Sequence, residues 1–255
     1  MDFKELKEFL DYKYYQYNQP EFITTDPVSI PHRFTKKEDI EIAAFLAATI
    51  AWGYRPSIIK SAEKLINLFN NSPFDFIMNV KEKELKPFQT FTHRTFQGDD
   101  ALCFIHSLKN IYQYHNGLQT LFYKGYRKNH SIKDSIIYFR KIFFECEHLQ
   151  RTEKHISNPE KNSSCKRINL FLRWMIRNDK LGVDFGIWEN FSASDLLCPL
   201  DLHSGNVSRK LGLLTRKQND WKAVEELTAN LRKFDPNDPV KYDFALFGLG
   251  IFEKF

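Results

Sequence analysis

The sequence predicts an all-helical protein, and three observations support that class. Apolar residues recur at the 3.6-residue spacing of amphipathic helices through most of the chain. Capping residues, prolines and glycines stand where such helices would begin and end. No alternating run bounded by turn residues predicts a strand. With 255 residues, of which 42% are hydrophobic and 27% charged, the chain is an ordinary globular sequence with ample material for a core.

The N-terminal part begins with an expected Tyr-rich amphipathic helix over residues 2–17. An extended, proline-punctuated stretch is expected over residues 19–34. Thr35 resembles an N-cap with Glu38 at the capping-box position, and it opens a helix that Gly53 ends. Because this helix is apolar on nearly all sides, we expect it at the centre of a core.

The rest of the chain continues the helical pattern. Pro56 suits the first turn of the next helix. Further helices are expected over residues 73–80, 99–115, 117–126, 131–147, 165–178, 203–213, 220–233 and 239–249. Residues 150–164 are polar and contain Asn-Pro and Ser-Ser pairs, so we expect a linker there. Asp238, between two prolines, is the expected N-cap of the last helix.

The four cysteines are Cys103, Cys146, Cys165 and Cys198, and no two have CxxC spacing. This pattern predicts neither a zinc site nor an iron–sulfur loop, and we expect no metal and no cofactor. The N-terminus lacks an apolar signal region, and the longest apolar run, residues 42–52, is too short to span a bilayer. We therefore expect a soluble, reduced, cytoplasmic protein without a membrane partner.

The segment KRINLFLRWMIR divides into two faces at helical spacing. Ile168 begins the apolar face, and Lys166, Arg173 and Arg177 share a stripe on the opposite face. A stripe of this kind is commonly a solvated surface, and its alternative is a helix held against a phosphate backbone. The net charge of +5 is compatible with a polyanionic partner but does not require one.

The segment PLDLHSGNVSRKLGLL places Asp201 where a helix would begin. A carboxylate there caps free N–H groups and is stabilised by the helix dipole, a role that is compatible with catalysis. His203 is expected to be a capping-region histidine rather than a metal ligand, because no second ligand stands at a suitable spacing.

These two segments carry a family resemblance. PLDLHSGNVSRKLGLL resembles the motif that follows the hairpin in helix-hairpin-helix DNA glycosylases, and CKRINLFLRWMIR resembles the helix that opens with the nucleophilic lysine in the archaeal 8-oxoguanine glycosylase branch. The resemblance covers about residues 157–215. It implies that Lys166 is the nucleophile and Asp201 the catalytic carboxylate. Over its full length the chain also resembles a bacterial family of conserved proteins without assigned function.

The resemblance implies one glycosylase-like unit over residues 1–255, with two helical subdomains flanking a basic cleft. One subdomain would comprise about residues 36–150, and the other about residues 1–35 together with 157–255. The implied nucleic-acid contacts are Ser163, Ser164, Arg167, Arg173, Arg177, His203, Arg209 and Arg55. The candidates for stacking on an extruded base are Trp52, Tyr54, Phe185 and Trp188.

Two departures from the family pattern stand out. The usual hairpin is Gly-rich, whereas the corresponding stretch here, NPEKNSSCK, has no glycine. Asp-Leu-His also replaces the usual Asp-Thr-His at residues 201–203.

The expected function is base-excision repair by a monomeric, nucleoid-associated DNA glycosylase with abasic-site lyase activity. Its partner would be double-stranded DNA that carries a damaged base or an abasic site. Two alternatives remain at this point: a non-catalytic DNA- or RNA-binding protein that retains the fold, and a helical protein–protein interaction domain whose basic stripe meets an acidic partner.

Overall fold

The computed structural model describes residues 1–255 and is built entirely from helices. It contains 13 α-helices and six short 3-10 helices, and its only extended pairings are two isolated bridges. The all-α class predicted from the sequence is confirmed. None of the helices combines the length and apolar character that crossing a membrane requires.

The chain forms two compact units. Unit 1 consists of residues 1–22 and 158–255, and unit 2 consists of residues 23–157. Residues 23–35, which we expected to belong with the C-terminal part, lie in unit 2. Lys166 and Asp201 both lie in unit 1, whereas the predicted residues Trp52, Tyr54 and Arg55 lie in unit 2.

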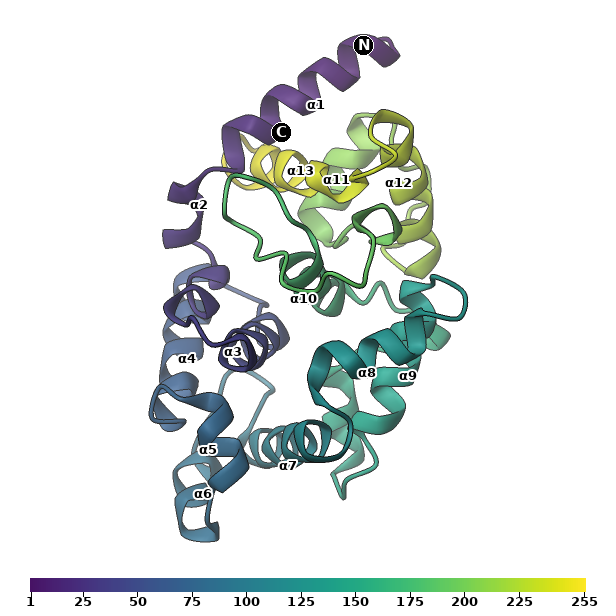
Figure 1. The fold of residues 1–255 in the computed structure, drawn as a ribbon. Coiled ribbons are helices and arrows are strands. Elements are labelled where there is room, and N and C mark those ends of the chain that lie inside the picture. Colours follow the sequence, from purple (N-terminus) through teal and green to yellow (C-terminus); the bar gives the residue numbers. More distant parts are fainter. The chain divides into compact units, whose positions relative to one another are not determined.

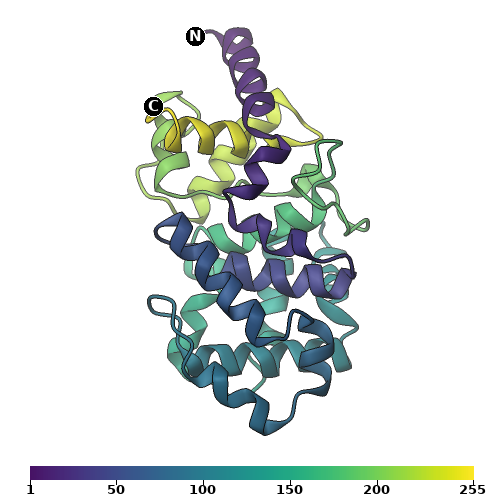
Figure 2. The ribbon, with the colours of Figure 1, turned by 90° about the vertical axis from the view of Figure 1, so that its left-hand side faces the viewer.

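Unit 2 is organised around α3. The α-helices of this unit are α3 (Lys37–Thr49), α4 (Arg55–Leu68), α5 (Pro73–Asn79), α6 (Glu82–Gln89), α7 (Gly98–Tyr114), α8 (Gly117–Tyr126) and α9 (Ile132–Phe143), and its 3-10 helices are η1 (Pro27–Ser29), η2 (Pro31–Arg33) and η3 (Gln150–His155). Every α3 residue from Asp39 to Thr49 is buried. The Phe45 ring contacts the rings of Phe104 and Phe143, and α4 runs obliquely across α3 (Figure 2). The predicted central position of this helix is confirmed.

Unit 1 packs its helices around α13. The α-helices are α1 (Phe3–Tyr17), α10 (Lys166–Ile176), α11 (Leu202–Lys210), α12 (Trp221–Phe234) and α13 (Tyr242–Ile251), and the 3-10 helices are η4 (Pro159–Lys161), η5 (Ala193–Asp195) and η6 (Pro239–Lys241). Helix α13 packs against both α1 and α11 (Figure 1). A Cβ atom at Gly248 would lie 2.1 Å from the Tyr17 ring, so the close approach of α1 to α13 requires glycine at this position.

Two expectations near the N-terminus are wrong. The stretch 19–34 is not extended, because it forms α2 (Pro20–Thr24) followed by η1 and η2. Each of these short helices starts with a proline, whose fixed φ angle suits the first helical position. The N-cap of α3 is Lys36 rather than Thr35, and α3 already ends at Thr49, so Gly53 follows in the next loop with a φ of 109°.

Three further expectations are corrected by the structure. Helix α6 was missed, because Pro87 lies inside it and reads as a helix breaker in sequence. The expected linker over 150–164 contains η3 and η4, and Thr152 and His155 within it are buried. Asp238 does not cap the last helix, since its carboxylate accepts hydrogen bonds from Nε of Arg177.

Candidate active site

Lys166 is the first residue of α10 and follows a loop that turns without glycine. Asn162 and Cys165 take the left-handed conformation there, with φ angles of 59° and 50°. Asparagine tolerates this region well, whereas a left-handed cysteine is uncommon and is held only by its surroundings. Two non-glycine residues thus reverse the backbone in this loop and direct the chain into α10.

Asp201 is the N-cap of α11, as predicted. Its Oδ1 accepts hydrogen bonds from the backbone N–H of Ser204 at 2.9 Å and from the Ser204 hydroxyl at 3.1 Å. In return, the Asp201 N–H donates to Ser204 Oγ at 2.9 Å. This capping box fixes the carboxylate and leaves its second oxygen, Oδ2, for another partner.

That partner is Lys166. Its Nζ lies 3.2 Å from Asp201 Oδ2, and the two side chains are 28% and 23% exposed. The structure therefore brings together the two residues that the sequence paired across 34 intervening positions. Burial raises the pKa of Asp201, but the Lys166 charge and the Ser204 hydrogen bonds outweigh it, so the pKa lies below its ordinary value. The carboxylate is consequently ionised at neutral pH.

A second carboxyl group lies within electrostatic reach of this pair. Asp243 of α13 is buried, and burial raises its pKa to about 6 although the Arg173 charge lowers it. The charges of Asp201 and Lys166 also contribute to that pKa. The Cys198 thiol donates to Asp243 Oδ1 at 3.9 Å. Asp243 was not singled out from the sequence, and no local signal marks it.

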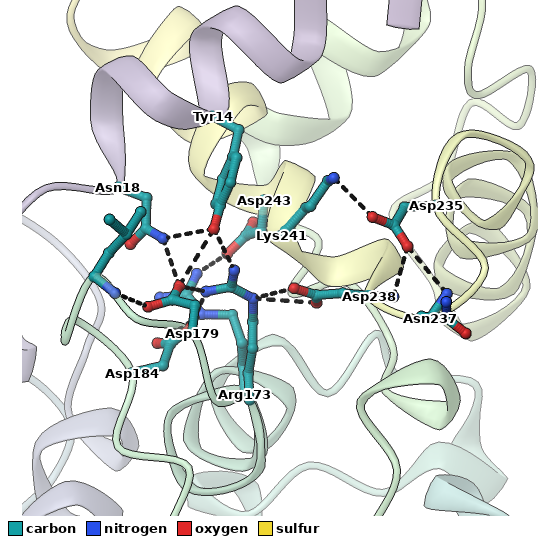
Figure 3. A network of polar contacts seen from close by, with 12 residues as sticks. Tyr14, Asn18, Arg173, Asp179, Asp184, Asp235, Asn237, Asp238, Lys241 and Asp243 are labelled. Atoms are coloured by element: carbon teal, nitrogen blue, oxygen red, sulfur yellow. Dashed lines mark hydrogen bonds and ion pairs between the residues drawn. The ribbon is translucent and has the colours of Figure 1, made fainter.

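Arg173 and Arg177 do not form an exposed cationic stripe, and this expectation is wrong. Their residues are 3% and 1% exposed. Arg173 pairs with Asp184 and Asp243, as the close view in Figure 3 shows. Both arginines are neutralised inside unit 1 and are unavailable to a phosphate backbone.

Arg177 is enclosed by carboxylates and by the end of α1. Its guanidinium pairs with Asp179, Asp184 and Asp238. It also donates to the hydroxyl of Tyr14 at 2.8 Å. The role of Arg177 is therefore structural, because groups inside the protein both neutralise its charge and accept its hydrogen bonds.

Two other predicted DNA contacts, Arg209 and Arg167, interact with residues of the protein itself. Arg209 donates to the carbonyls of Arg216 and Lys217 and to Asn219 Oδ1, and so it holds the loop between α11 and α12. Asn219 in turn donates to the Asp201 carbonyl at 2.8 Å. Burial lowers the pKa of Arg167 to about 10, which leaves it charged at neutral pH.

Three predicted contacts are more accessible. Ser163 and Ser164 are half-buried in the loop that leads into α10, and the Ser164 carbonyl accepts from Asn169 Nδ2. His203 is exposed in the first turn of α11, two residues after Asp201. In sequence, all three residues lie within three positions of Lys166 or Asp201.

The four aromatic candidates separate into core and surface. Trp188 is buried between the rings of Phe171 and Phe191, so its expected role as a base-stacking side chain is wrong. Phe185 is half-buried, and its N–H donates to the Trp174 carbonyl.

The remaining candidates follow α3 in unit 2. Tyr54 is 74% exposed, and Arg55 is half-buried at the start of α4. Trp52 is half-buried, with an edge-to-face contact to His93 and a stacked contact to His155.

Sequence reasoning missed the groups that hold the site. Ser204 could have been found, since it stands three residues after Asp201, where a capping box places its reciprocal partner. Asn219 and Asp243 reach the site only through the packing of the loop before α12 and of α13. No cluster of three or more His, Cys, Asp or Glu side chains is arranged to hold a metal ion.

Comparison with known proteins gives one match. No curated protein and no solved structure matches the chain. Residues 26–252 match a family described as "Protein of unknown function (DUF2400)". This region includes unit 2 from residue 26 onward and unit 1 from residue 158 to residue 252, with both Lys166 and Asp201. The chain therefore belongs to this family of unknown function.

Proposed function

We propose that the protein is a base-excision DNA glycosylase with abasic-site lyase activity, and that Lys166 and Asp201 are its catalytic pair. The observation that supports this proposal is the 3.2 Å approach of the Lys166 amine to the Asp201 carboxylate at the starts of α10 and α11. An amine nucleophile next to an ionised carboxylate is what glycosidic-bond cleavage through a Schiff base requires. The partial exposure of both side chains leaves the pair open to a substrate.

The two oxygens of Asp201 have separate tasks in this mechanism. Oδ1 is held by Ser204, so the carboxylate keeps its position as charge develops. Oδ2 faces the Lys166 amine and would face the sugar next to it. Positive charge grows on the sugar as the glycosidic bond breaks, and a fixed anion stabilises that charge. The lowered pKa of Asp201 keeps the anion present at neutral pH.

Protons and electron pairs are conserved through the proposed steps. The Lys166 amine gives up a proton and bonds to C1′, and the glycosidic bond breaks with its electron pair passing to the departing base. The base takes up one proton as it leaves, which balances the proton released by the amine. The C1′–O4′ bond then breaks with its electron pair passing to O4′, which takes up the remaining proton of the amine, and a Schiff base forms between Lys166 and C1′. Removal of a C2′ proton forms a C2′–C3′ double bond and expels the 3′ phosphate with the electron pair of the C3′–O bond, so that the strand is cleaved by β-elimination.

The target base has to leave the duplex before these steps can occur. The exposed His203 and the half-buried Ser163 and Ser164 are polar residues within three positions of the pair in sequence. They are the residues of unit 1 that we assign to contacts with the extruded nucleotide and its phosphates.

Borohydride trapping tests the proposal. Duplexes carrying an oxidised base or an abasic site are incubated with the protein and sodium borohydride, which reduces a Schiff base to a stable adduct. We expect an adduct with the wild-type protein and none with Lys166→Gln. Lys161→Gln is the matched control, because Lys161 is an exposed lysine five residues away, and this variant should be trapped like the wild type.

The variants also separate the alternatives. If Lys161→Gln lowers trapping as much as Lys166→Gln, the adduct arises from accessible lysines in general and the assignment of Lys166 is wrong. If the wild-type protein binds the duplexes without forming any adduct, the protein is a non-catalytic nucleic-acid binder.

A further inference from the structure

The net positive charge of the protein belongs to one of its two units. Unit 2 holds 19 Lys and Arg residues against 14 Asp and Glu, whereas unit 1 holds 18 against 18. The entire net charge of +5 thus belongs to unit 2. Unit 1, which contains Lys166 and Asp201, is electrically neutral overall. A protein that binds a polyanion through unit 1 alone would lack the charge that ordinarily supplies most of the affinity.

Within unit 2 the excess lies in a single acid-free segment. From Ala101 to Lys133, 33 residues, the chain contains no Asp or Glu. The same segment contains five cations: Lys109, Lys124, Arg127, Lys128 and Lys133. These five equal the whole net charge of the unit. Three of them, Lys124, Arg127 and Lys128, lie at the turn between α8 and α9, and we call these three residues the basic turn.

The structure holds the basic turn on a rigid support. A Cβ atom at Gly125 would lie 2.8 Å from the Asp134 carbonyl oxygen, so α8 and α9 approach each other at backbone distance just before the turn. His130 Nδ1 lies 3.2 Å from the Tyr126 hydroxyl, and the two rings meet edge to face. A short, packed turn of this kind presents its side chains at defined positions.

The three cations of the basic turn point to solvent. Lys124, Arg127 and Lys128 are all exposed, and no carboxylate pairs with any of them. In contrast, Asp134, the first acid after the acid-free segment, accepts a hydrogen bond from Asn129 Nδ2, and its backbone N–H donates to the Ser131 hydroxyl. The charge of the basic turn is therefore not neutralised within the protein.

Helix electrostatics account for only part of this arrangement. Lys124 and Arg127 stand at the C-terminal end of α8, where the helix dipole favours cations. The dipole gives no reason for the absence of acids along 33 residues. An external polyanion explains that absence.

We infer that the basic turn binds the phosphate backbone of duplex DNA and supplies the electrostatic affinity that unit 1 lacks. The inference rests on the proposed function for the choice of DNA as the polyanion. The contact is independent of base sequence, since flexible lysines and an arginine on a turn meet phosphates rather than base edges.

The test is the salt dependence of binding to an undamaged duplex, on which Lys166 has no reaction to perform. The triple variant Lys124→Gln, Arg127→Gln, Lys128→Gln is compared with the wild type by fluorescence anisotropy over a range of salt concentrations. Each phosphate contact contributes about 0.9 to the slope of log K against log salt. We expect the slope to fall by about 2 to 3 in the triple variant.

A second triple variant serves as the matched control. Lys81, Lys83 and Lys86 are three exposed lysines in and beside α6, and Glu82 and Glu84 lie between them. Substituting all three by Gln removes the same charge from the same unit. We expect the slope of this variant to differ from that of the wild type by less than one contact, about 0.9.

The possible outcomes separate this inference from the proposed function. An unchanged slope in the basic-turn variant overturns the inference, as does an equal loss in both triple variants, and neither result affects borohydride trapping by Lys166. A wild-type protein that fails to bind duplex DNA at low salt also overturns it and leaves an acidic protein as the partner. If trapping fails while the slope falls as expected, the glycosylase proposal is wrong and the DNA contact stands.

Discussion

The two ends of α10 carry the same kind of side chain into different environments. Lys166 at its first turn is partly exposed and pairs with one carboxylate, Asp201. Arg173, two turns later on the same stripe, is buried between Asp184 and Asp243, and Arg177 just beyond the helix is buried among three carboxylates. The N-terminal end of α10 remains accessible, whereas the buried ion pairs at its C-terminal end hold the unit together. A shared helical face thus does not imply a shared role.

The difference also has an electrostatic side. The buried end gathers more acids than bases, and Asp243 and Asp238 have pKa values above the ordinary value of Asp, in each case mainly because of burial. The accessible end holds one amine and one carboxylate, and the pKa of that carboxylate is lowered. Four measurements test this contrast between the two ends.

The largest expected effect is at the buried end. Arg177→Met leaves Asp179 and Asp238 without their cation and removes one of the two cations of Asp184. Removal of one partner from a buried ion pair costs about 3–5 kcal/mol. Chemical denaturation measures the change in the free energy of unfolding. Lys180→Met, at an exposed position three residues away, is the control and should change it by less than about 0.5 kcal/mol. Equal effects of the two substitutions would show that the network contributes little.

A pH-dependent effect comes next. The folded-state pKa of Asp243 is about 6, above its ordinary value. The folded protein therefore holds a proton that the unfolded chain has lost, so this group stabilises the fold at low pH and its contribution disappears as the pH rises through about 6. The contribution is about 3 kcal/mol, from two pKa units at about 1.4 kcal/mol each.

Asp243→Asn removes this titration. We expect the difference in unfolding free energy between variant and wild type to change by about 2 kcal/mol between pH 4.5 and pH 7.5, measured by urea denaturation across the range. Parallel profiles for the two proteins would be inconsistent with a proton on Asp243.

A smaller effect is expected at the capping box. Ser204→Ala removes the acceptor of the Asp201 N–H and one donor to Asp201 Oδ1, which should cost about 1 kcal/mol of stability. Asn206→Ala on the exposed side of the same helix is the control and should cost less. A loss confined to Ser204→Ala in thermal denaturation supports the capping role. No loss in either variant would contradict it.

The smallest stability effect is expected at the accessible end. Lys166→Gln should change the free energy of unfolding by less than about 1 kcal/mol, because partly exposed ion pairs contribute little. A double-mutant cycle with Asp201→Asn measures the coupling between the two side chains. If the coupling free energy were as large as the loss of stability in Arg177→Met, the Lys166–Asp201 pair would have a structural role and the contrast between the ends of α10 would disappear.

Much of this molecule follows from local sequence signals. The helical class is confirmed, and the 117–126 helix matches its predicted bounds. The placement of Lys166 in the first turn of a helix and of Asp201 at an N-cap also follows from the sequence. These features depend on residues within a few positions of each other, where periodicity, capping and proline geometry act. Helix α6 was missed where two local signals conflict, because Pro87 stands inside an otherwise helical pattern.

The burial of charge was decided by tertiary structure. Helical periodicity placed Arg173 and Arg177 on a polar stripe. Two of their partners, Asp179 and Asp184, follow within 11 residues. Asp243 and Asp238, however, are 70 and 61 residues away, and Tyr14 lies 163 residues from Arg177, so no local window of sequence contains both members of these long-range pairs. A cation can be buried only where carboxylates offset the free-energy cost of its desolvation. For the long-range partners of Arg173 and Arg177, the packing of α1, α10 and α13 determines whether those groups lie close enough.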